Sequence, residues 1–195
     1  MSQSQSFLNF VRSAAGITPD EEQQILRRFQ TVSLKNKEYF LREGEVCKRI
    51  GYVEQGCLSY YRLLENGKKA IVQFAFEDWW IGDLESFLQR KPAQTFWQAL
   101  EPCELVCIGR DDFERMMTIS PVFRSVFTKK TQTAYIKALE RSAWDKADSA
   151  EQKYLRLLKE YPQILKRVPH YDVAAYLGIT PESLSRIRKK VAKAR

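Results

Sequence analysis

The sequence has no run of about 18 apolar residues, which is the length that a helix needs to cross a bilayer. A secretory leader has basic residues followed by an apolar segment. The first residues here, MSQSQS, are polar and have neither feature. Histidine occurs once, at His170, and the cysteines do not have the spacing of zinc ligands. The cysteines are Cys47, Cys57, Cys103 and Cys107. We therefore expect a cytoplasmic protein with reduced, half-buried thiols, no metal site, no cofactor and no membrane partner.

The patterns that usually carry catalysis are also missing. There is no Ser/His/Asp or Cys/His arrangement, no phosphate loop of the GxxxxGK type, and no pair of carboxylates to which a pocket can be assigned. The sequence therefore predicts a binding protein and not an enzyme.

Positive charge is concentrated in the C-terminal part of the chain. Residues 1–120 contain 15 Lys and Arg against 17 Asp and Glu, a balance of −2, whereas residues 121–195 contain 17 against 7, a balance of +10. This asymmetry indicates an anionic partner for the C-terminal part alone. Nucleic acid is favoured over a membrane surface, because no wide face of Trp, Phe and Leu accompanies the basic residues.

The hydrophobic pattern changes along the chain. Residues 6–30 have helical spacing, with a capping box from Thr18 to Glu21 and a buried face that includes Phe29. From residue 32 to 108, short segments rich in β-branched and aromatic residues alternate with turn signals. This predicts an antiparallel β-roll or sandwich with flanking helices, which makes the chain α+β.

The strand region contains a hairpin signal and a short helix signal. Asn66-Gly67 is a strong hairpin signal, because both residues tolerate the positive φ of a tight turn. Between two strands, Gly82-Asp83-Leu84 opens a short helix that we expect to run from Glu85 to Gln89. A helix N-terminus beside a glycine can receive a phosphate, and the alternative is an ordinary loop over the roll. The residues alone leave these two alternatives open.

Pro121 begins a long helix that we expect to reach Lys146. Its apolar residues form two stripes, so the helix can pack on its own roll and on a second subunit at the same time. One stripe is Val122, Val126, Ile136 and Ala143, and the other is Phe123, Phe127, Ala134 and Ala138. We therefore expect a homodimer, the alternative being a helix covered within the monomer. A further amphipathic segment, residues 151–167, links this helix to the C-terminal part.

Residues 170–190, HYDVAAYLGITPESLSRIRKK, have the pattern of two short helices that bury a small core between them. Gly178 suits the left-handed position that ends a helix. Thr180 is a suitable N-cap for the next helix, and Pro181 a suitable first residue. The pattern predicts a helix-turn-helix.

The outer face of the second helix is polar and basic, and the last ten residues of the chain include six basic residues and no acidic one. In a helix-turn-helix the second helix enters the major groove, where Arg can bind guanine and a carboxylate can accept from cytosine N4. The residues of this face are Glu182, Ser183, Ser185, Arg186, Lys189 and Lys190. A helical hairpin with a solvated charged face is the alternative, but spacing, glycine, N-cap and charge together favour DNA binding.

With these features the chain resembles the Crp/Fnr superfamily of bacterial transcription regulators, named for the cyclic AMP receptor protein and FNR. The resemblance rests on the turn glycines Gly44 and Gly56, on Gly82-Asp83-Leu84, on the long helix and on LGITPESLSRIRKK. It implies a cyclic-nucleotide-binding-like β-roll, or double-stranded β-helix, that senses an effector, a dimerisation helix and an all-α helix-turn-helix domain. The corresponding residues are 1–120, 121–146 and 147–195.

The resemblance also implies partners and residue roles. Glu182 and Arg186 correspond to residues that contact bases, here in the palindromic operator of a double-stranded DNA. A small-molecule effector and RNA polymerase are further implied partners. The other positions at which we expect DNA contacts are Thr180, Ser183, Ser185, Arg188, Lys189 and Lys190.

The chain departs from the family pattern at the nucleotide site. Members that bind cyclic nucleotides have a glutamate for the ribose and an arginine for the cyclic phosphate, and Asp83 and Ala93 stand at those positions here. Without the guanidinium a buried phosphate lacks its bidentate partner, so we do not expect cyclic AMP as the effector. The positions of an effector pocket would be Gly82, Asp83, Leu84, Ala93, Gln94 and Thr95. Such a pocket could be empty, suited to an uncharged ligand, or filled by side chains such as Phe96 and Trp97.

A second departure concerns the helix-turn-helix domain. Members of the family usually have a small β-hairpin wing beside the helices, whereas only VPHYD separates the connecting segment from the helix-turn-helix here. We therefore expect a wingless domain. The competing hypothesis for the whole chain is a ligand-sensing signalling module that binds an acidic protein partner through its basic C-terminal domain.

Overall fold

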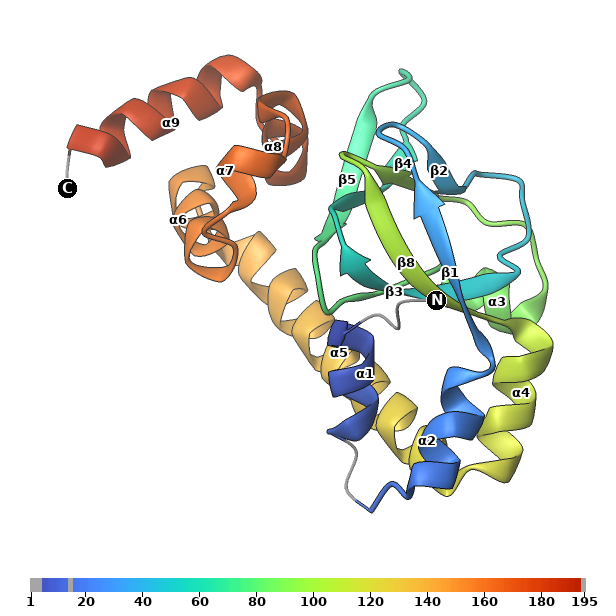
Figure 1. The fold of residues 1–195 in the computed structure, drawn as a ribbon. Coiled ribbons are helices and arrows are strands. Elements are labelled where there is room, and N and C mark those ends of the chain that lie inside the picture. Colours follow the sequence, from blue (N-terminus) through green and yellow to red (C-terminus); the bar gives the residue numbers. More distant parts are fainter. Residues whose placement is uncertain (1–4, 14–15, 194–195) are drawn as a thin grey trace.

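The computed structural model describes residues 5–13 and 16–193, the side chains of residues 145 and 146 excepted. Two short helices, α1 (Gln5–Arg12) and α2 (Pro19–Leu26), precede the strands, and α2 begins at the predicted capping box of Thr18 and Glu21 (Figure 1). The sequence predicted that Phe29 is part of this helical segment, but it is not. It begins strand β1, because its backbone pairs with Ile108 and its ring packs 4.6 Å from that of Phe7.

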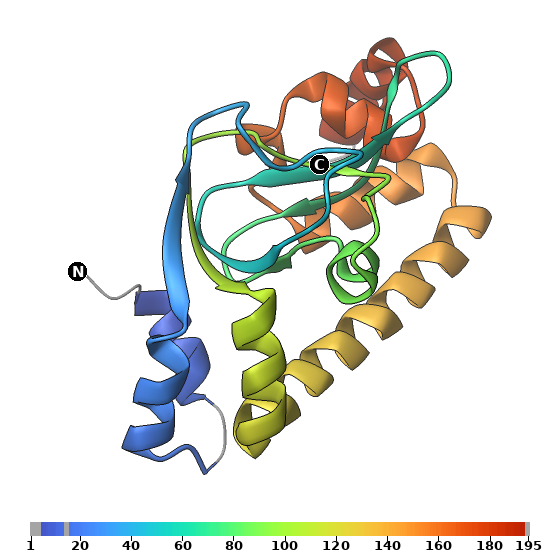
Figure 2. The same cartoon turned by 90° about the vertical axis from the view of Figure 1, so that its right-hand side faces the viewer.

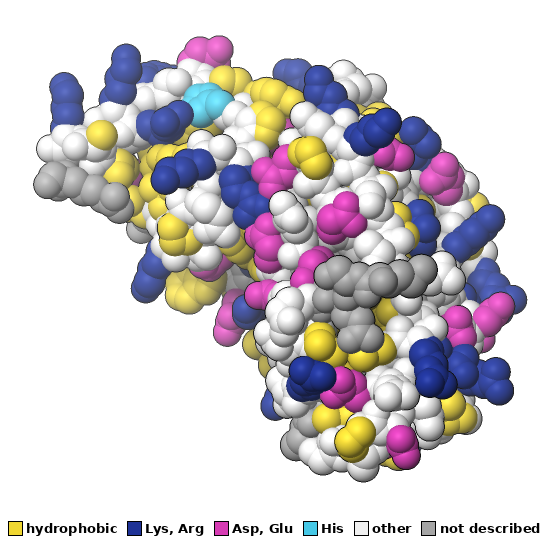
Figure 3. All heavy atoms as spheres, in the orientation of Figure 1, with side chains coloured by type: hydrophobic (Ala, Val, Ile, Leu, Met, Phe, Trp, Pro, Cys, Tyr) yellow, Lys and Arg dark blue, Asp and Glu magenta, His cyan; other side chains and the backbone are white. Residues whose placement is uncertain are grey.

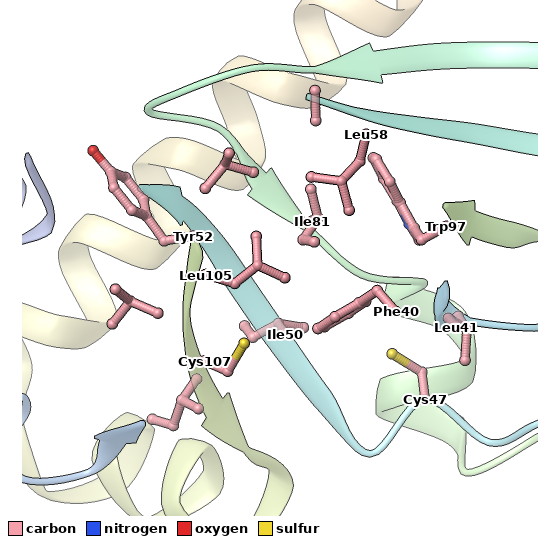
Figure 4. Close-up of a cluster of buried hydrophobic side chains, with 14 of the residues drawn as sticks. Phe40, Leu41, Cys47, Ile50, Tyr52, Leu58, Ile81, Trp97, Leu105 and Cys107 are labelled. Carbon is pink, nitrogen blue, oxygen red and sulfur yellow. The ribbon is translucent and has the colours of Figure 1, made fainter. Parts of the chain in front are cut away.

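Within the described residues, eight strands form two antiparallel four-stranded sheets, as the alternating pattern predicted. The order is β1-β8-β3-β6 in the first sheet and β2-β7-β4-β5 in the second. The strands are β1 (Phe29–Leu34), β2 (Tyr39–Leu41), β3 (Arg49–Gln55), β4 (Leu58–Leu63), β5 (Lys69–Ala75), β6 (Trp80–Ile81), β7 (Phe96–Ala99) and β8 (Cys103–Gly109). Because the inner faces of both sheets carry apolar side chains, the main core lies between them (Figure 4).

All four cysteines are buried and unbridged, and not half-buried as expected. Burial raises the pKa of Cys103 to about 11 and that of Cys107 to about 12. Since the thiolate is the reactive form, these thiols act as small core side chains at neutral pH.

Two turn glycines behave differently from each other. At Gly56 φ is +110°, and a Cβ there would lie 2.5 Å from Cys103 Sγ, so only glycine fits. The hairpin predicted at Asn66-Gly67 joins β4 and β5, and of these two residues Gly67 has a positive φ and Asn66 does not. The Gly67 N–H donates to the Leu64 carbonyl at 2.8 Å, and Asn66 Oδ1 accepts from the Lys68 N–H at 3.1 Å. The asparagine thus stabilises the turn through its side chain.

Helix α3 lies within the strand region, and helices α4 and α5 come after it. Helix α3 (Leu84–Gln89) was predicted, whereas α4 (Arg110–Ile119), which follows β8 directly, and the two-residue strand β6 were not. The long helix α5 (Pro121–Ala147) has Ser120 as its N-cap and ends one residue beyond the prediction. It runs from the end of the molecule at which α2 and α4 lie to the C-terminal helices (Figure 2).

The C-terminal helices pack on the outer face of the second sheet. They are α6 (Ala150–Glu160), α7 (Ile164–Arg167), α8 (His170–Leu177) and α9 (Pro181–Lys193). Val173 and Leu177 of α8 join a buried cluster with Ile71 and Phe74 of β5. The interface also buries Asp172, whose carboxylate has no hydrogen-bond partner among the described residues, and burial raises its pKa. No strand follows β8 within residues 110–193, which agrees with the predicted wingless domain.

Arg167 connects the C-terminal helices to the roll. Its guanidinium donates two hydrogen bonds of 2.7 Å to Glu77, also contacts Glu101, and lies 5.2 Å from the ring centroid of Phe76. Glu77 also accepts the Gly56 N–H at 2.8 Å. Burial by itself would raise the pKa of Glu77, but these hydrogen bonds outweigh it and hold the pKa at about 2. The carboxylate is therefore charged wherever the protein is folded at ordinary pH.

We expect Glu77→Gln to lower the free energy of unfolding by about 1 kcal/mol at pH 7, since the pair is partly exposed and screened. The folded pKa of Glu77 lies below its ordinary value of 4.5. Its stabilisation is thus present above that value and is lost as pH falls towards 2. Urea denaturation should show the difference between wild type and variant shrinking over this range. Glu65→Gln, at an exposed turn residue, is the control, and an equal loss at both ends of the range would contradict this account.

Candidate nucleic-acid interface and effector pocket

The turn between α8 and α9 has the geometry that its residues predicted. Gly178 has φ +68°, and the Ile179 N–H donates to the Ala174 carbonyl at 3.0 Å, which closes α8 with a left-handed cap. Thr180 Oγ1 accepts from the Ser183 N–H at 3.3 Å, and its carbonyl accepts from the Leu184 N–H at 3.0 Å. Thr180 is therefore the N-cap of α9, and the two helices form a helix-turn-helix.

Helix α9 has one buried face and one exposed face. Leu184 is fully buried, and Ile187 and Val191 pack against the same cluster. The predicted DNA-contact residues lie off this stripe, and basic side chains stand along α9 at the upper left of Figure 3. Ser183 is half-buried, and the exposed members are Thr180, Glu182, Ser185, Arg186, Arg188, Lys189 and Lys190. With about 100° between successive helical residues, Arg188 lies at the flank of the face that Glu182, Arg186 and Lys189 share.

Local contacts orient the two residues for which base contacts are expected. Arg186 Nη2 donates to Ser183 Oγ at 3.2 Å, and Ser183 Oγ lies 3.2 Å from Thr180 Oγ1. The backbone N–H of Glu182 and the Thr180 hydroxyl lower the pKa of the Glu182 carboxyl. Glu182 is thus an ionised acceptor one helical turn from a guanidinium donor, which is the pair of groups that can read cytosine and guanine.

Two lysines of this face differ in their surroundings. Lys190 Nζ forms a 2.6 Å ion pair with Glu151 of α6, whereas Lys189 has no hydrogen bond or ion pair with any described residue. No local pattern indicated this difference, because Glu151 is 39 residues away from Lys190. Exposed ion pairs contribute little stability, so a phosphate can compete for Lys190, but Lys189 is the simpler phosphate ligand.

Of the predicted effector-pocket residues, Asp83 and Thr95 come together but bind each other, whereas Leu84 and Gln94 are exposed. Asp83 is buried; its Oδ1 accepts from the Ser86 N–H at 3.0 Å and its Oδ2 accepts from the Thr95 hydroxyl at 2.7 Å. Ala93 is also buried and pairs with the turn at Gly44, whose N–H donates to the Ala93 carbonyl at 2.8 Å. Asp83 thus acts as the N-cap of α3 and as a link to the β7 side of the roll.

Aromatic side chains occupy the interior beside these residues. Trp97 lies in the core between the sheets, and its ring stacks on Tyr60 with centroids 4.7 Å apart (Figure 4). Phe96, the other residue expected to fill the pocket, points to the opposite face of the sheet and stacks on Tyr61 with centroids 5.0 Å apart. The alternation of side chains along β7 separates these neighbours, so only one of them packs in the interior.

If Asp83 is structural, Asp83→Ala should lower the free energy of unfolding by about 2 kcal/mol, since the variant loses the cap and leaves Thr95 without its acceptor. Asp83→Asn keeps a cap acceptor and should cost less. Both values can be read from urea denaturation curves. Unchanged stability in Asp83→Ala would mean that the carboxylate does no structural work.

The sequence did not predict the clamp formed by Arg167. Ninety residues separate it from Glu77, and no local pattern links the two. Among the described residues, no helix is both long enough and apolar enough to cross a membrane.

Comparison with known proteins agrees with this geometry. A family model described as cyclic nucleotide-binding domain matches residues 31–120. No protein with a curated description matches the sequence. Solved structures with a similar fold include the c-di-GMP-responsive global regulator CLP of Xanthomonas campestris, with 13% identity and a TM-score of 0.71 over 88% of this chain and 90% of that one. FixK2 of Bradyrhizobium japonicum has 18% identity and a TM-score of 0.73 over 85% of each chain. The catabolite activator protein of Thermus thermophilus has 19% identity and a TM-score of 0.57 over 92% and 86%.

Proposed function

We propose that this chain is a homodimeric, DNA-binding transcription regulator: its residues 31–120 belong to the cyclic nucleotide-binding domain family, and it has the fold of Crp/Fnr transcription regulators. The basic outer face of α9 binds DNA, α5 pairs two subunits, and the roll is the sensory part. The effector is not cyclic AMP, because Ala93 supplies no guanidinium and Asp83 is bound to Thr95.

The exposure of α5 carries the proposal of a dimer. The first turns of the helix pack on their own subunit through Phe123 and Phe127, but every residue from 132 to 140 is exposed. Tyr135, Ile136 and Leu139 are 64%, 55% and 53% exposed. A helix that is stabilised by packing on an apolar face needs such side chains covered, and a second copy of α5 is the simplest cover.

The two predicted stripes of α5 are revised accordingly. Val122 and Val126 face a cavity of their own subunit, whereas Ile136, assigned to the same stripe, is exposed on another side. With about 100° between successive residues, Tyr135, Ile136 and Leu139 lie on the side roughly opposite Ala134. The dimer seam is thus centred on Tyr135 and Leu139.

DNA recognition would use both subunits of such a dimer. Each would place α9 in one major-groove half-site, with half-sites about 34 Å apart. Arg186 and Glu182 would read bases, while Thr180, Ser183, Ser185, Arg188, Lys189 and Lys190 would hold the backbone. Arg186 is exposed and forms no ion pair with any described residue, which supports this division.

Leu139→Asp should convert the dimer to monomers, because it places a charge in the apolar seam of both subunits. Ala134→Asp introduces the same charge on the opposite side of the same exposed segment and should leave the dimer intact. Sedimentation equilibrium of the two variants measures the difference. If both variants remained dimeric, α5 would not hold the seam.

Arg186→Ala should weaken binding to a duplex selected by the wild-type protein by about 1–3 kcal/mol and relax the base preference at one position. Lys189→Ala should weaken all sequences alike and reduce the slope of log affinity against log salt by about 1. Fluorescence anisotropy over a salt series with selected and scrambled duplexes separates the two effects. Identical behaviour of both variants would refute the division of roles, and the absence of any salt dependence would favour an acidic protein as the partner.

A further inference from the structure

A cavity of about 830 Å³ lies where the N-terminal helices, the roll, α5 and the C-terminal helices meet. This is within the size range of small-molecule sites. The cavity shares Gly82 and Leu84 with the predicted effector pocket but includes none of Ala93, Gln94 and Thr95. It is therefore a separate space, outside the core of the roll.

One end of this junction cavity is aromatic. Phe7 and Phe10 of α1 lie against Trp80 of β6, with ring centroids 6.3 and 5.7 Å away, and Phe123 and Phe127 of α5 complete this end. Surfaces of this kind take up flat or flexible apolar groups through burial alone.

The other end is cationic. Lys137 and Arg141 are four residues apart on α5 and so share a face, and Lys153 of α6 lines the same end. None of the three has a hydrogen bond or ion pair with a described residue. Arg156 also lines this end but pairs with Asp148, and the acidic side chains there are Glu140 and Glu160. From Phe127 to Arg141 the helix rises about 20 Å, which separates these three cations from the aromatic end, where Lys130 also lines the cavity 5.0 Å from the Phe10 ring centroid.

The proposed dimer does not fill this space. Lys137, Arg141, Ala134 and Ala138 lie on one side of α5, and the exposed Leu139 lies on the other. A second subunit packed on Leu139 therefore leaves the cavity to another occupant.

We propose that the junction cavity binds an amphipathic carboxylate, with the acid group held by Lys137, Arg141 and Lys153 and the apolar body held between α1, β6 and the start of α5. The occupant would contact the roll, α5 and the C-terminal helices at once. Its role as the effector rests on the proposed function, but its binding does not.

Tryptophan fluorescence of the purified full-length protein tests this directly, because Trp79, Trp80 and Trp144 line the cavity. Two brominated probes, dibromostearate and bromonaphthoate, distinguish an aliphatic from an aromatic acid, and their methyl esters serve as uncharged controls. We expect saturable quenching by at least one acid and about tenfold weaker binding of its ester, as loss of a charged hydrogen bond would give.

Variants locate the site. Lys137→Gln should weaken acid binding about tenfold without changing ester binding, whereas Lys129→Gln, an exposed lysine of the same helix outside the cavity, should have no effect. Ala138→Phe should abolish binding by filling the space. No saturable quenching by either acid, equal binding of acid and ester, or wild-type affinity in both cavity variants would overturn the proposal. Arg186→Ala changes the proposed DNA-binding face and should bind the acid with wild-type affinity. The acid-binding result therefore does not depend on whether the DNA-binding proposal is correct.

Discussion

A helix of 27 residues that only partly contacts its own subunit is the constraint on which this structure depends. The first turns of α5 are anchored by Phe123 and Phe127 in the aromatic part of the core, but every residue from 132 to 140 is exposed. Isolated helices gain little from propensity, and most helical stability in proteins comes from packing an apolar face. The exposed Tyr135 and Leu139 are the basis of the proposed dimer, in which two copies of α5 would present two copies of α9.

The position of α9 depends on contacts far from it. The C-terminal helices rest on the outer face of the second sheet through a shared apolar cluster, and Arg167 ties them to Glu77 and Glu101 of the roll. The same interface buries Asp172 without a partner among the described residues, which costs free energy when the carboxylate is charged. The docking of the C-terminal helices on the roll thus combines a partly exposed ion-pair cluster with one buried carboxylate that has no hydrogen-bond partner among the described residues.

Elements with a local code were predictable from the sequence. The helix-turn-helix follows from Gly178 and Thr180. Gly178 has no side chain and adopts the left-handed conformation that ends α8, and the Thr180 side chain caps α9. The strands follow from alternation, and α3 from the helix signal at Gly82-Asp83-Leu84. The strand β6 was missed because two residues show no period, and Phe29 was misassigned because its pairing partner lies 79 residues away, at Ile108.

The candidate sites also divide into features that depend on local sequence and features that depend on contacts between distant segments. The polar face of α9 could be predicted, since it depends only on spacing within one helix. The ion pair of Lys190 with Glu151, the clamp of Arg167 and the cavity at the junction could not, because each joins segments that are distant in sequence. The sequence also left open whether Gly82-Asp83-Leu84 forms a phosphate site or an ordinary loop. In the structure the Asp83 carboxylate accepts hydrogen bonds from Ser86 and Thr95 and caps α3.

The most direct measurement is the mass of the protein bound to a duplex that it has selected from random DNA, determined by analytical ultracentrifugation. The account predicts two chains per duplex and a selected sequence with two-fold symmetry, since both copies of α9 are presented by one pair of α5 helices. One chain per duplex, or a selected sequence without symmetry, would contradict it.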